Sequence, residues 1–238
     1  MGQPIQPALD KTISILVWNV YKTRKNGWQY DFLKLIPNRD LVLLQESVIN
    51  NHDNSIFEKS RRFEWIMACS HKYRGSQIIT GLATGSIAKS SAQEFLHSPD
   101  REPFLKTSKL VLATKFHLEN SYKTLLVLNV HAINFVGLKK YSRHINQILS
   151  LTQTHTGPII LAGDFNCWSN ARLELLFECI KNEGLIEVAL DRETHWHHLN
   201  HHLDHIFYRD LHLIKAETLS NINSSDHYPI LAEFIFHS

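Results

Sequence analysis

The sequence predicts an α+β domain in which two β-sheets pack against each other and helices flank them. Short apolar runs rich in Val, Ile and Leu recur along the whole chain between polar connections, whereas only three segments carry a helical pattern. This balance of many strands and few helices is typical of a sheet-on-sheet sandwich. No repeat, low-complexity tract or long linker divides the 238 residues. We therefore expect one domain over residues 13–238, preceded by an N-terminal tail of residues 1–12.

Each expected strand is a short apolar run that ends at polar or turn-forming residues. Pro229 stiffens the entry into the last of them. In chain order, the strands are expected at 13–20, 41–45, 63–68, 81–87, 110–117, 124–130, 159–163, 203–208, 213–219 and 230–236.

Three helices are expected, at 28–36, 137–153 and 170–183. The second and third have apolar residues at helical spacing, which predicts one buried face for each. Gly184 stands where it can end the third helix. The apolar stripe of the second helix is Leu138, Tyr141, Ile145, Ile148, Leu149 and Thr152, and that of the third is Leu173, Leu176, Phe177 and Ile180.

The composition excludes several classes of protein. Hydrophobic residues make up 43% and charged residues 20%, which rules out a disordered or fibrous chain. The net charge of +2 is too small to indicate a polyanionic partner by itself. Three cysteines without CxxC spacing argue against a disulfide framework and a thiolate zinc site. No apolar stretch is long enough to span a membrane and no signal peptide is visible, so we expect a cytoplasmic monomer, although a removed leader is compatible with the sequence.

Several of the apolar runs end on polar residues of the types that catalyse reactions. Side chains two apart on a strand face the same way, so Asn129 points with His131, and Asp164 points with Asn166. If these strands lie side by side, their ends place carboxylates, amides and an imidazole around one rim of the sheets. Polar residues also end strands for no catalytic reason, but four such endings in one chain favour a site. The residues concerned are Asn19, Glu46, Asn129, His131, Asp164 and Asn166.

Two later segments extend this pattern. Asp204 begins a strand, and Asp226 and His227 lie in a turn just before the last strand. A carboxylate that is hydrogen-bonded to a histidine fixes its tautomer and stabilises the imidazolium.

The residue types also suit a metal and a phosphate. Hard cations such as Mg²⁺ prefer carboxylate and amide oxygens, which Glu46, Asp226 and Asn19 could supply. Asp164 and Asn166 could hold a water molecule beside a phosphorus atom, a reaction that needs in-line geometry and charge neutralisation.

The ordered motifs WNV, LLQE, NVHAIN, GDFN, LDHIFY and SDHYP resemble those of the endonuclease/exonuclease/phosphatase superfamily. Its members include deoxyribonuclease-I-like nucleases, apurinic endonucleases, deadenylases, sphingomyelinases and inositol polyphosphate 5-phosphatases. The resemblance runs from about Ile13 to Phe236, and LVWNVYK, HAINF and GDFNCWS are most similar to a bacterial branch, the YafD-like proteins. It implies a four-layer α/β sandwich, two packed mixed sheets flanked by helices, with a site at one rim.

The resemblance also implies a role for each motif residue. Metal, as Mg²⁺ or Mn²⁺, is expected at Asn19, Glu46 and Asp226. His131 is expected to contact the scissile phosphate or to act as a general acid. Asp164 and Asn166 match the pair that orients the attacking water, and Asp204 and His227 match the dyad that stabilises the pentacovalent transition state. Asn129 and Asn134 are expected to contact the substrate.

The chain departs from the family pattern in three places. Between Cys69 and Thr80 it has no acidic residue to support His131. The PAWCDR signature of inositol 5-phosphatases is replaced by the sequence around Asp204. Long basic or aromatic insertions that would enter a DNA groove are not evident.

Three functions therefore stay open: a phosphodiesterase or nuclease acting on nucleic acid, a hydrolase of lipid or inositol phosphates, and a catalytically inactive binding module. Two further features are ambiguous. The histidine-rich stretch 195–205 fits a second metal site or a polar connection, whereas His205 is expected to pack on the opposite face from Asp204. Trp168 could stack on a base or pack in the core.

Overall fold

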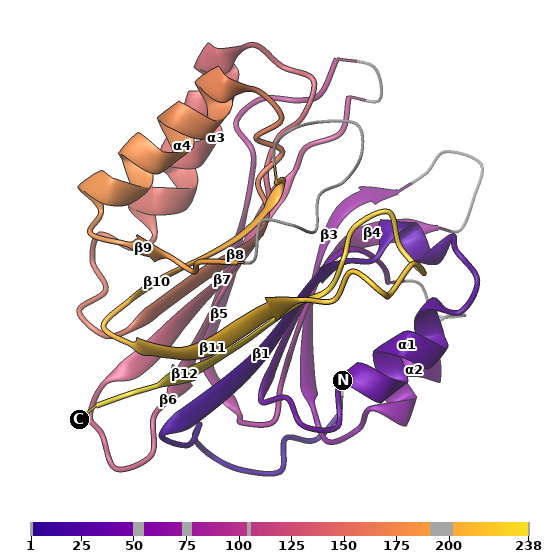
Figure 1. The fold of residues 1–238 in the computed structure, drawn as a ribbon, viewed down its shortest axis with the longest axis vertical. Helices are drawn as coiled ribbons and strands as arrows, with labels where there is room; N and C mark the ends of the chain where they lie inside the picture. The colour runs from indigo at the N-terminus through magenta and orange to yellow at the C-terminus, as the bar shows by residue number, and fades with distance from the viewer. Residues whose placement is uncertain (1, 50–54, 73–77, 104–105, 191–201, 238) are drawn as a thin grey trace.

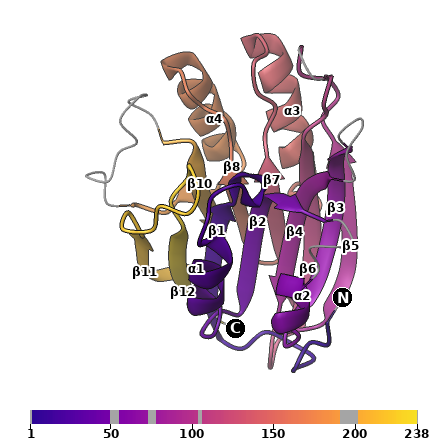
Figure 2. The ribbon, with the colours of Figure 1, turned by 90° about the vertical axis from the view of Figure 1, so that its right-hand side faces the viewer.

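Two mixed β-sheets of six strands each pack face to face, and helices cover their outer faces (Figures 1 and 2). The structure is a computed structural model that describes residues 2–49, 55–72, 78–103, 106–190 and 202–237. The four-layer sandwich expected from the sequence is confirmed.

The first sheet has the strand order β11-β12-β1-β2-β4-β3. Strands β1 and β2 are parallel, and helix α1 (Trp28–Leu35) connects them. Helix α2 (Ser55–Lys59) lies beside α1 on the outer face (Figure 1). The strands are β1 (Thr12–Asn19), β2 (Leu41–Val48), β3 (Glu64–Lys72), β4 (Ile79–Ser86), β11 (His212–Thr218) and β12 (Ile230–Ile235).

The second sheet has the strand order β5-β6-β7-β8-β10-β9. Strands β7 and β8 are parallel and are connected by helix α3 (Leu138–Ser150), which packs with helix α4 (Asn170–Asn182) on the other outer face (Figure 1). The strands are β5 (Ser90–His97), β6 (Leu110–His117), β7 (Thr124–His131), β8 (Ile159–Asp164), β9 (Ile186–Glu187) and β10 (Asp204–Arg209).

Burial of the apolar runs explains why these elements form. One core takes side chains from both sheets and from helices α1 and α2, and a second core lies between the second sheet and helices α3 and α4. In α3 the predicted stripe is buried at Tyr141, Ile145, Ile148 and Leu149. Helix α4 begins at an N-cap, Ser169, whose side chain accepts a hydrogen bond from the N–H of Arg172. No helix in the described part of the chain is long and apolar enough to cross a membrane.

All ten predicted strands and three predicted helices are present, but the sequence pattern missed four elements within the residues that the structure describes. These are β5, the two-residue strand β9, helix α2 and the 3₁₀ turn Tyr21–Thr23. Strand β5 lies at the edge of its sheet, and most of its side chains are exposed. A strand that buries so little apolar surface carries no apolar run for the sequence to reveal.

The strand directions bring the ends of several strands to one rim. The parallel strands β7 and β8 end there in register, so that His131 lies beside Asp164. Strand β10 runs antiparallel to β8 and begins there, with Asp204 beside Asp164. Gly163 allows β7 and β8 to approach, because a Cβ atom at this position would lie 2.1 Å from the carbonyl oxygen of Val130.

Candidate active site

Asp164 lies at the centre of a buried group of polar side chains. Its Oδ2 accepts a hydrogen bond from Asn19 Nδ2 at 3.0 Å and lies 3.4 Å from His131 Nε2 and 4.0 Å from His227 Nε2. Its Oδ1 accepts the backbone N–H of Asn166 at 2.9 Å. Burial raises the pKa of Asp164 to about 6, and the charge of Asp204 adds to this, although His227 opposes it. A carboxylate with such a pKa can take up a proton near neutral pH.

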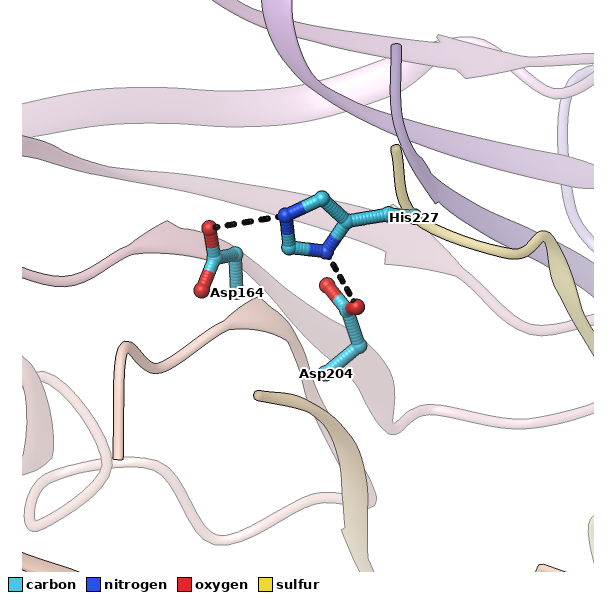
Figure 3. A group of neighbouring side chains, drawn as sticks. All are labelled: Asp164, Asp204 and His227. Carbon is cyan, nitrogen blue, oxygen red and sulfur yellow. Dashed lines mark hydrogen bonds and ion pairs between the residues drawn. The ribbon is translucent and has the colours of Figure 1, made fainter. Parts of the chain in front are cut away.

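Asp204 and His227 form the predicted dyad. His227 Nδ1 lies 2.5 Å from Asp204 Oδ2, while the other ring nitrogen faces Asp164 (Figure 3). Burial alone would lower the pKa of His227, but Asp204, together with the other nearby carboxylates, outweighs burial and raises the pKa to about 10. The imidazole is therefore protonated at neutral pH. Trp18 fixes the turn that carries it, because its Nε1 donates to the carbonyl oxygen of His227 at 3.0 Å.

His131 contacts a cation, Lys109. The sequence had offered no acidic residue between Cys69 and Thr80 to support this histidine. Lys109 Nζ lies 2.9 Å from His131 Nε2 and 3.7 Å from Glu102 Oε1. Burial, Lys109 and His227 hold the pKa of His131 well below its usual value, so its ring is neutral at pH 7 and Nε2 accepts from the ammonium group. Lys109 and Glu102 were not predicted. Lys109 directly precedes β6, whose first residue pairs with His131, and only the strand pairing reveals this contact.

Glu46 stands on an irregular part of β2, where the register against β4 shifts. Its backbone has φ 52°, and its carboxylate lies 2.8 Å from Lys22 Nζ and 3.9 Å from Lys109 Nζ. Glu46, Asp226 and Asn19 line the same cavity as Asp164. They are thus brought to one place, as the sequence predicted.

The side-chain oxygens of Glu46, Asp226 and Asn19 suit a hard divalent cation. Burial raises the pKa of Asp226, and the negative charge of Glu46 contributes to this. A cation held between the two carboxylates would offset the repulsion that raises the pKa of Asp226, and their oxygens together with the Asn19 amide are ligands that Mg²⁺ accepts.

A second group could also hold a metal. One ligand atom from each of Asp164, Asp204 and His227 lies within 4.8 Å of the others. In the described part of the chain, Asp204 Oδ1 is buried and has no hydrogen-bond partner. Because this group includes an imidazole, which ligates a metal only after it has lost its proton, it suits a transition metal better than Mg²⁺.

Positive backbone φ angles are concentrated around this site. Residues other than glycine adopt such angles at a cost of about 1–3 kcal/mol and do so mainly where the surrounding structure enforces them. Their presence on several rim segments indicates that the fold holds the site in a fixed shape. The residues are Tyr21, Lys22, Thr23, Glu46, Phe135 and Asn166.

The predicted substrate contact at Asn129 needs correction. Asn129 points to the same side of β7 as His131, but it is fully buried between the sheets. Its Oδ1 accepts from Gln45 Nε2 at 2.7 Å, and its Nδ2 donates to the carbonyl oxygens of Leu44 and Ala83. Asn129 therefore connects the two sheets beneath the site, whereas Asn134 does line the cavity.

The histidine-rich stretch separates into two parts. Its residues 195–201 lie outside the described residues. His205 packs on the face opposite to Asp204, as expected, stacked on Phe207 and hydrogen-bonded to Glu187 Oε1 at 2.9 Å.

A cavity of about 490 Å³ opens at this rim and takes its walls from both sheets. It contains carboxylates, a protonated imidazole and two lysines within reach of one another. Such an arrangement can bind an anionic group and deliver a base to it. Among the residues at its walls are Asn19, Lys22, Glu46, Lys109, His131, Asn134, Phe135, Asp164, Asn166, Asp204, Asp226 and His227.

Comparison with known proteins gives a consistent answer. The model of the endonuclease/exonuclease/phosphatase family matches residues 16–227. A UPF0294 protein of Vibrio campbellii is 32% identical over 94% of this chain and 78% of its own length, consistent with the YafD-like branch.

Solved structures agree in fold. An endonuclease/exonuclease/phosphatase from Beutenbergia cavernae superposes with a TM-score of 0.76 at 12% identity, covering 96% of this chain and 72% of its own. The human nocturnin catalytic domain, solved with a bound sulfate anion, has a TM-score of 0.72 at 17% identity, and the match covers 97% of this chain and 96% of the nocturnin domain. The chain belongs to the endonuclease/exonuclease/phosphatase family, a family of phosphate-ester hydrolases.

Proposed function

We propose that this protein is a divalent-metal-dependent phosphodiesterase of the nuclease type, in which water attacks the phosphorus in line. One observation carries the proposal: a buried carboxylate, Asp164, lies within 4.0 Å of Asn19, His131 and His227 in a cavity that also contains two lysines. This set supplies a base and several groups that favour negative charge in one desolvated space.

Asp164 would accept the proton of the attacking water. Its pKa of about 6 leaves it ionised at neutral pH and still basic enough to take up a proton. The N–H of Asn166 holds one carboxylate oxygen and Asn19 holds the other, so the base is oriented before substrate binds.

Three cations would stabilise the charge that develops on the phosphate oxygens. His227 is protonated because of Asp204, and Lys22 and Lys109 line the same cavity. His131, neutral and bonded to Lys109, would orient that ammonium group towards the phosphate rather than donate its own proton. Preorganised charges of this kind are effective because they need no rearrangement during the reaction.

Mg²⁺ or Mn²⁺ would be held by Glu46, Asp226 and Asn19, where it would neutralise the phosphate and stabilise the leaving oxygen. Binding can be measured without turnover. Titration of Mg²⁺ into the chelator-treated protein by calorimetry should give a signal that Glu46→Gln abolishes.

Hydrolysis of bis(p-nitrophenyl) phosphate, with Mg²⁺, Mn²⁺ or chelator, tests the proposal. We expect activity that chelator removes and that Asp164→Asn or His227→Ala lowers by orders of magnitude. Asp210→Asn is the matched control, since Asp210 follows the opposite end of β10 from Asp204 and should leave activity unchanged. Full activity in Asp164→Asn or His227→Ala would refute the assignment.

A lipid or inositol phosphate is the second candidate substrate. Leu190, Leu203 and Ile230 line the cavity beside the dyad and could accommodate an apolar group. A panel of plasmid DNA, RNA, phospholipid and inositol phosphates distinguishes the two candidates. A catalytically inactive binding module is disfavoured, because such a protein would be expected to have lost part of the acid, amide and histidine set.

A further inference from the structure

Two aromatic side chains stand exposed beside the catalytic cavity. Phe135 lines the cavity and is 62% exposed, and Trp168 is 37% exposed. They lie on the two loops that follow β7 and β8, directly after the segments that carry His131 and Asp164. Both side chains are therefore open to solvent, Phe135 in the cavity wall and Trp168 next to Asn134, which also lines the cavity.

Asn134 fixes both aromatic residues. Its Oδ1 accepts the backbone N–H of Phe135 at 2.8 Å and the indole Nε1–H of Trp168 at 2.8 Å. Its own N–H donates to Glu102 Oε1 at 3.0 Å, and Glu102 is buried. The two loops are thus joined through a single amide oxygen.

Arg172 supports this arrangement from below. Arg172 is only 2% exposed, and its guanidinium lies 4.7 Å from the ring of Trp168 and 4.5 Å from that of Tyr141. It donates to the carbonyl oxygens of Val136 at 2.6 Å and Asn166 at 2.8 Å. A buried guanidinium that binds both loops keeps the aromatic pair in place before any ligand arrives, which lowers the entropic cost of binding.

The backbone of Phe135 gives an independent indication of function. Its φ is 52°, an angle that a bulky side chain rarely adopts and that persists mainly at functional sites. Burial of the ring does not explain it, because the ring is exposed.

The ligand must present a flat group to these rings and an anion to the cavity. Lys22, Lys109 and His227 line the same cavity as Phe135, and the proposed function assigns these three cations to the phosphate. A nucleotide joins a phosphate to a planar base, and a base outside a duplex can stack on exposed aromatic side chains. A membrane would need only exposed apolar side chains, not an indole fixed by an amide and a guanidinium.

Building on the phosphodiesterase function proposed above, we propose that Phe135 and Trp168 form a stacking platform for an unpaired nucleobase next to the scissile phosphate. The substrate class that follows is a single-stranded nucleic acid or a nucleotide ester.

Two substrates that differ only in the base test the proposal. They are thymidine 5′-(p-nitrophenyl phosphate) and its abasic analogue with dideoxyribose in place of the nucleoside. We expect kcat/KM to favour the base-containing substrate about tenfold or more, mainly through KM, and Phe135→Ala or Trp168→Ala to remove that preference. Phe135→Trp should retain it.

Phe95→Ala is the matched control. Phe95 is 51% exposed but lies on the edge strand β5, outside the cavity walls, so the preference should be unchanged. A preference that survives in both Phe135→Ala and Trp168→Ala would overturn the platform.

A binding measurement separates this proposal from the proposed function. In chelator, thymidine 5′-monophosphate should bind more tightly than deoxyribose 5-phosphate, and Phe135→Ala should equalise the two. That result would support the platform even if neither ester were hydrolysed, whereas equal binding to the wild-type protein would overturn it. Loss of binding to phosphatidylglycerol vesicles in Phe135→Ala, without any effect on base preference, would assign the rings to a membrane instead.

Discussion

Replacing Arg172 by lysine should both destabilise the protein and lower its turnover. Arg172 donates to three backbone carbonyls, those of Asn166, Val136 and Ile133, at 2.8, 2.6 and 3.3 Å, and is almost completely buried. A lysine carries its donors on one nitrogen and cannot reproduce the fork, so about two of these bonds are lost. Hydrogen bonds to a charged group contribute about 1.5–3 kcal/mol each, which predicts a loss of roughly 3–6 kcal/mol in unfolding free energy.

Arg209→Lys provides the comparison. Arg209 also donates to two backbone carbonyls, those of Glu183 and His155 at 3.2 and 2.7 Å, but it is partly exposed and lies at the end of β10 away from the site. Water can replace part of its interaction, so we expect a loss of about 1 kcal/mol and an unchanged kcat.

Urea unfolding gives the free energies, and kcat is measured at a temperature where each variant is folded. Arg172→Lys should lower kcat because Asn166 and the loop after His131 shift, and a displacement of about 1 Å near the reacting groups can cost about 100-fold in rate. Equal free energies and equal kcat values for the two variants would refute the idea that Arg172 positions the site.

Two further predictions concern the dyad and the amide between the sheets. The raised pKa of His227 stabilises the fold fully below pH 6.5, and this stabilisation is lost as the pH rises through about 10. In urea unfolding, the wild type should therefore exceed Asp204→Asn in stability at low pH, and this excess should shrink by a few kcal/mol over that range. The pKa of His205 is also raised to about 10, so only the difference between the two proteins reports His227, and a constant difference would contradict the argument. Asn129→Ala should cost about 2–4 kcal/mol of stability and leave kcat/KM of the folded enzyme unchanged, because it removes buried hydrogen bonds, one of them from Gln45, and no cavity wall. Reduced kcat/KM at unchanged stability would restore Asn129 as a substrate contact.

The sequence was sufficient for the strands because most of them are buried. The run at β8 is buried at all six positions, and an apolar run of that kind is visible without knowledge of its partners. Strand β5 could not be found in this way, since Phe95 and most of its neighbours face solvent at the edge of the sheet. What defines β5 is its pairing with β6, which no local pattern contains.

The site was partly predictable for a similar reason. Residues that end parallel strands must share a rim, so His131 and Asp164 could be expected to meet. The sequence could not predict which residues on the same face of β7 reach the cavity. Asn129 lies two residues, or about 7 Å, before His131, and that distance places it in the interior between the sheets instead of in the cavity. Lys109 was missed because its contact with His131 depends on the register of an antiparallel neighbour.

The site spans the interface between the two sheets, and this determines what holds its geometry. Asn19, on the first sheet, bonds Asp164 on the second at 3.0 Å, and His227, just before β12, bonds Asp204 on β10. Apolar packing between the sheets is non-directional and fixes their relative position only loosely. Hydrogen bonds do so far more strictly, because they weaken steeply when their angle or distance changes. The cross-sheet bonds at the rim therefore hold the groups of the candidate site in register, and the buried bond of Asn129 beneath them keeps the two sheets from sliding.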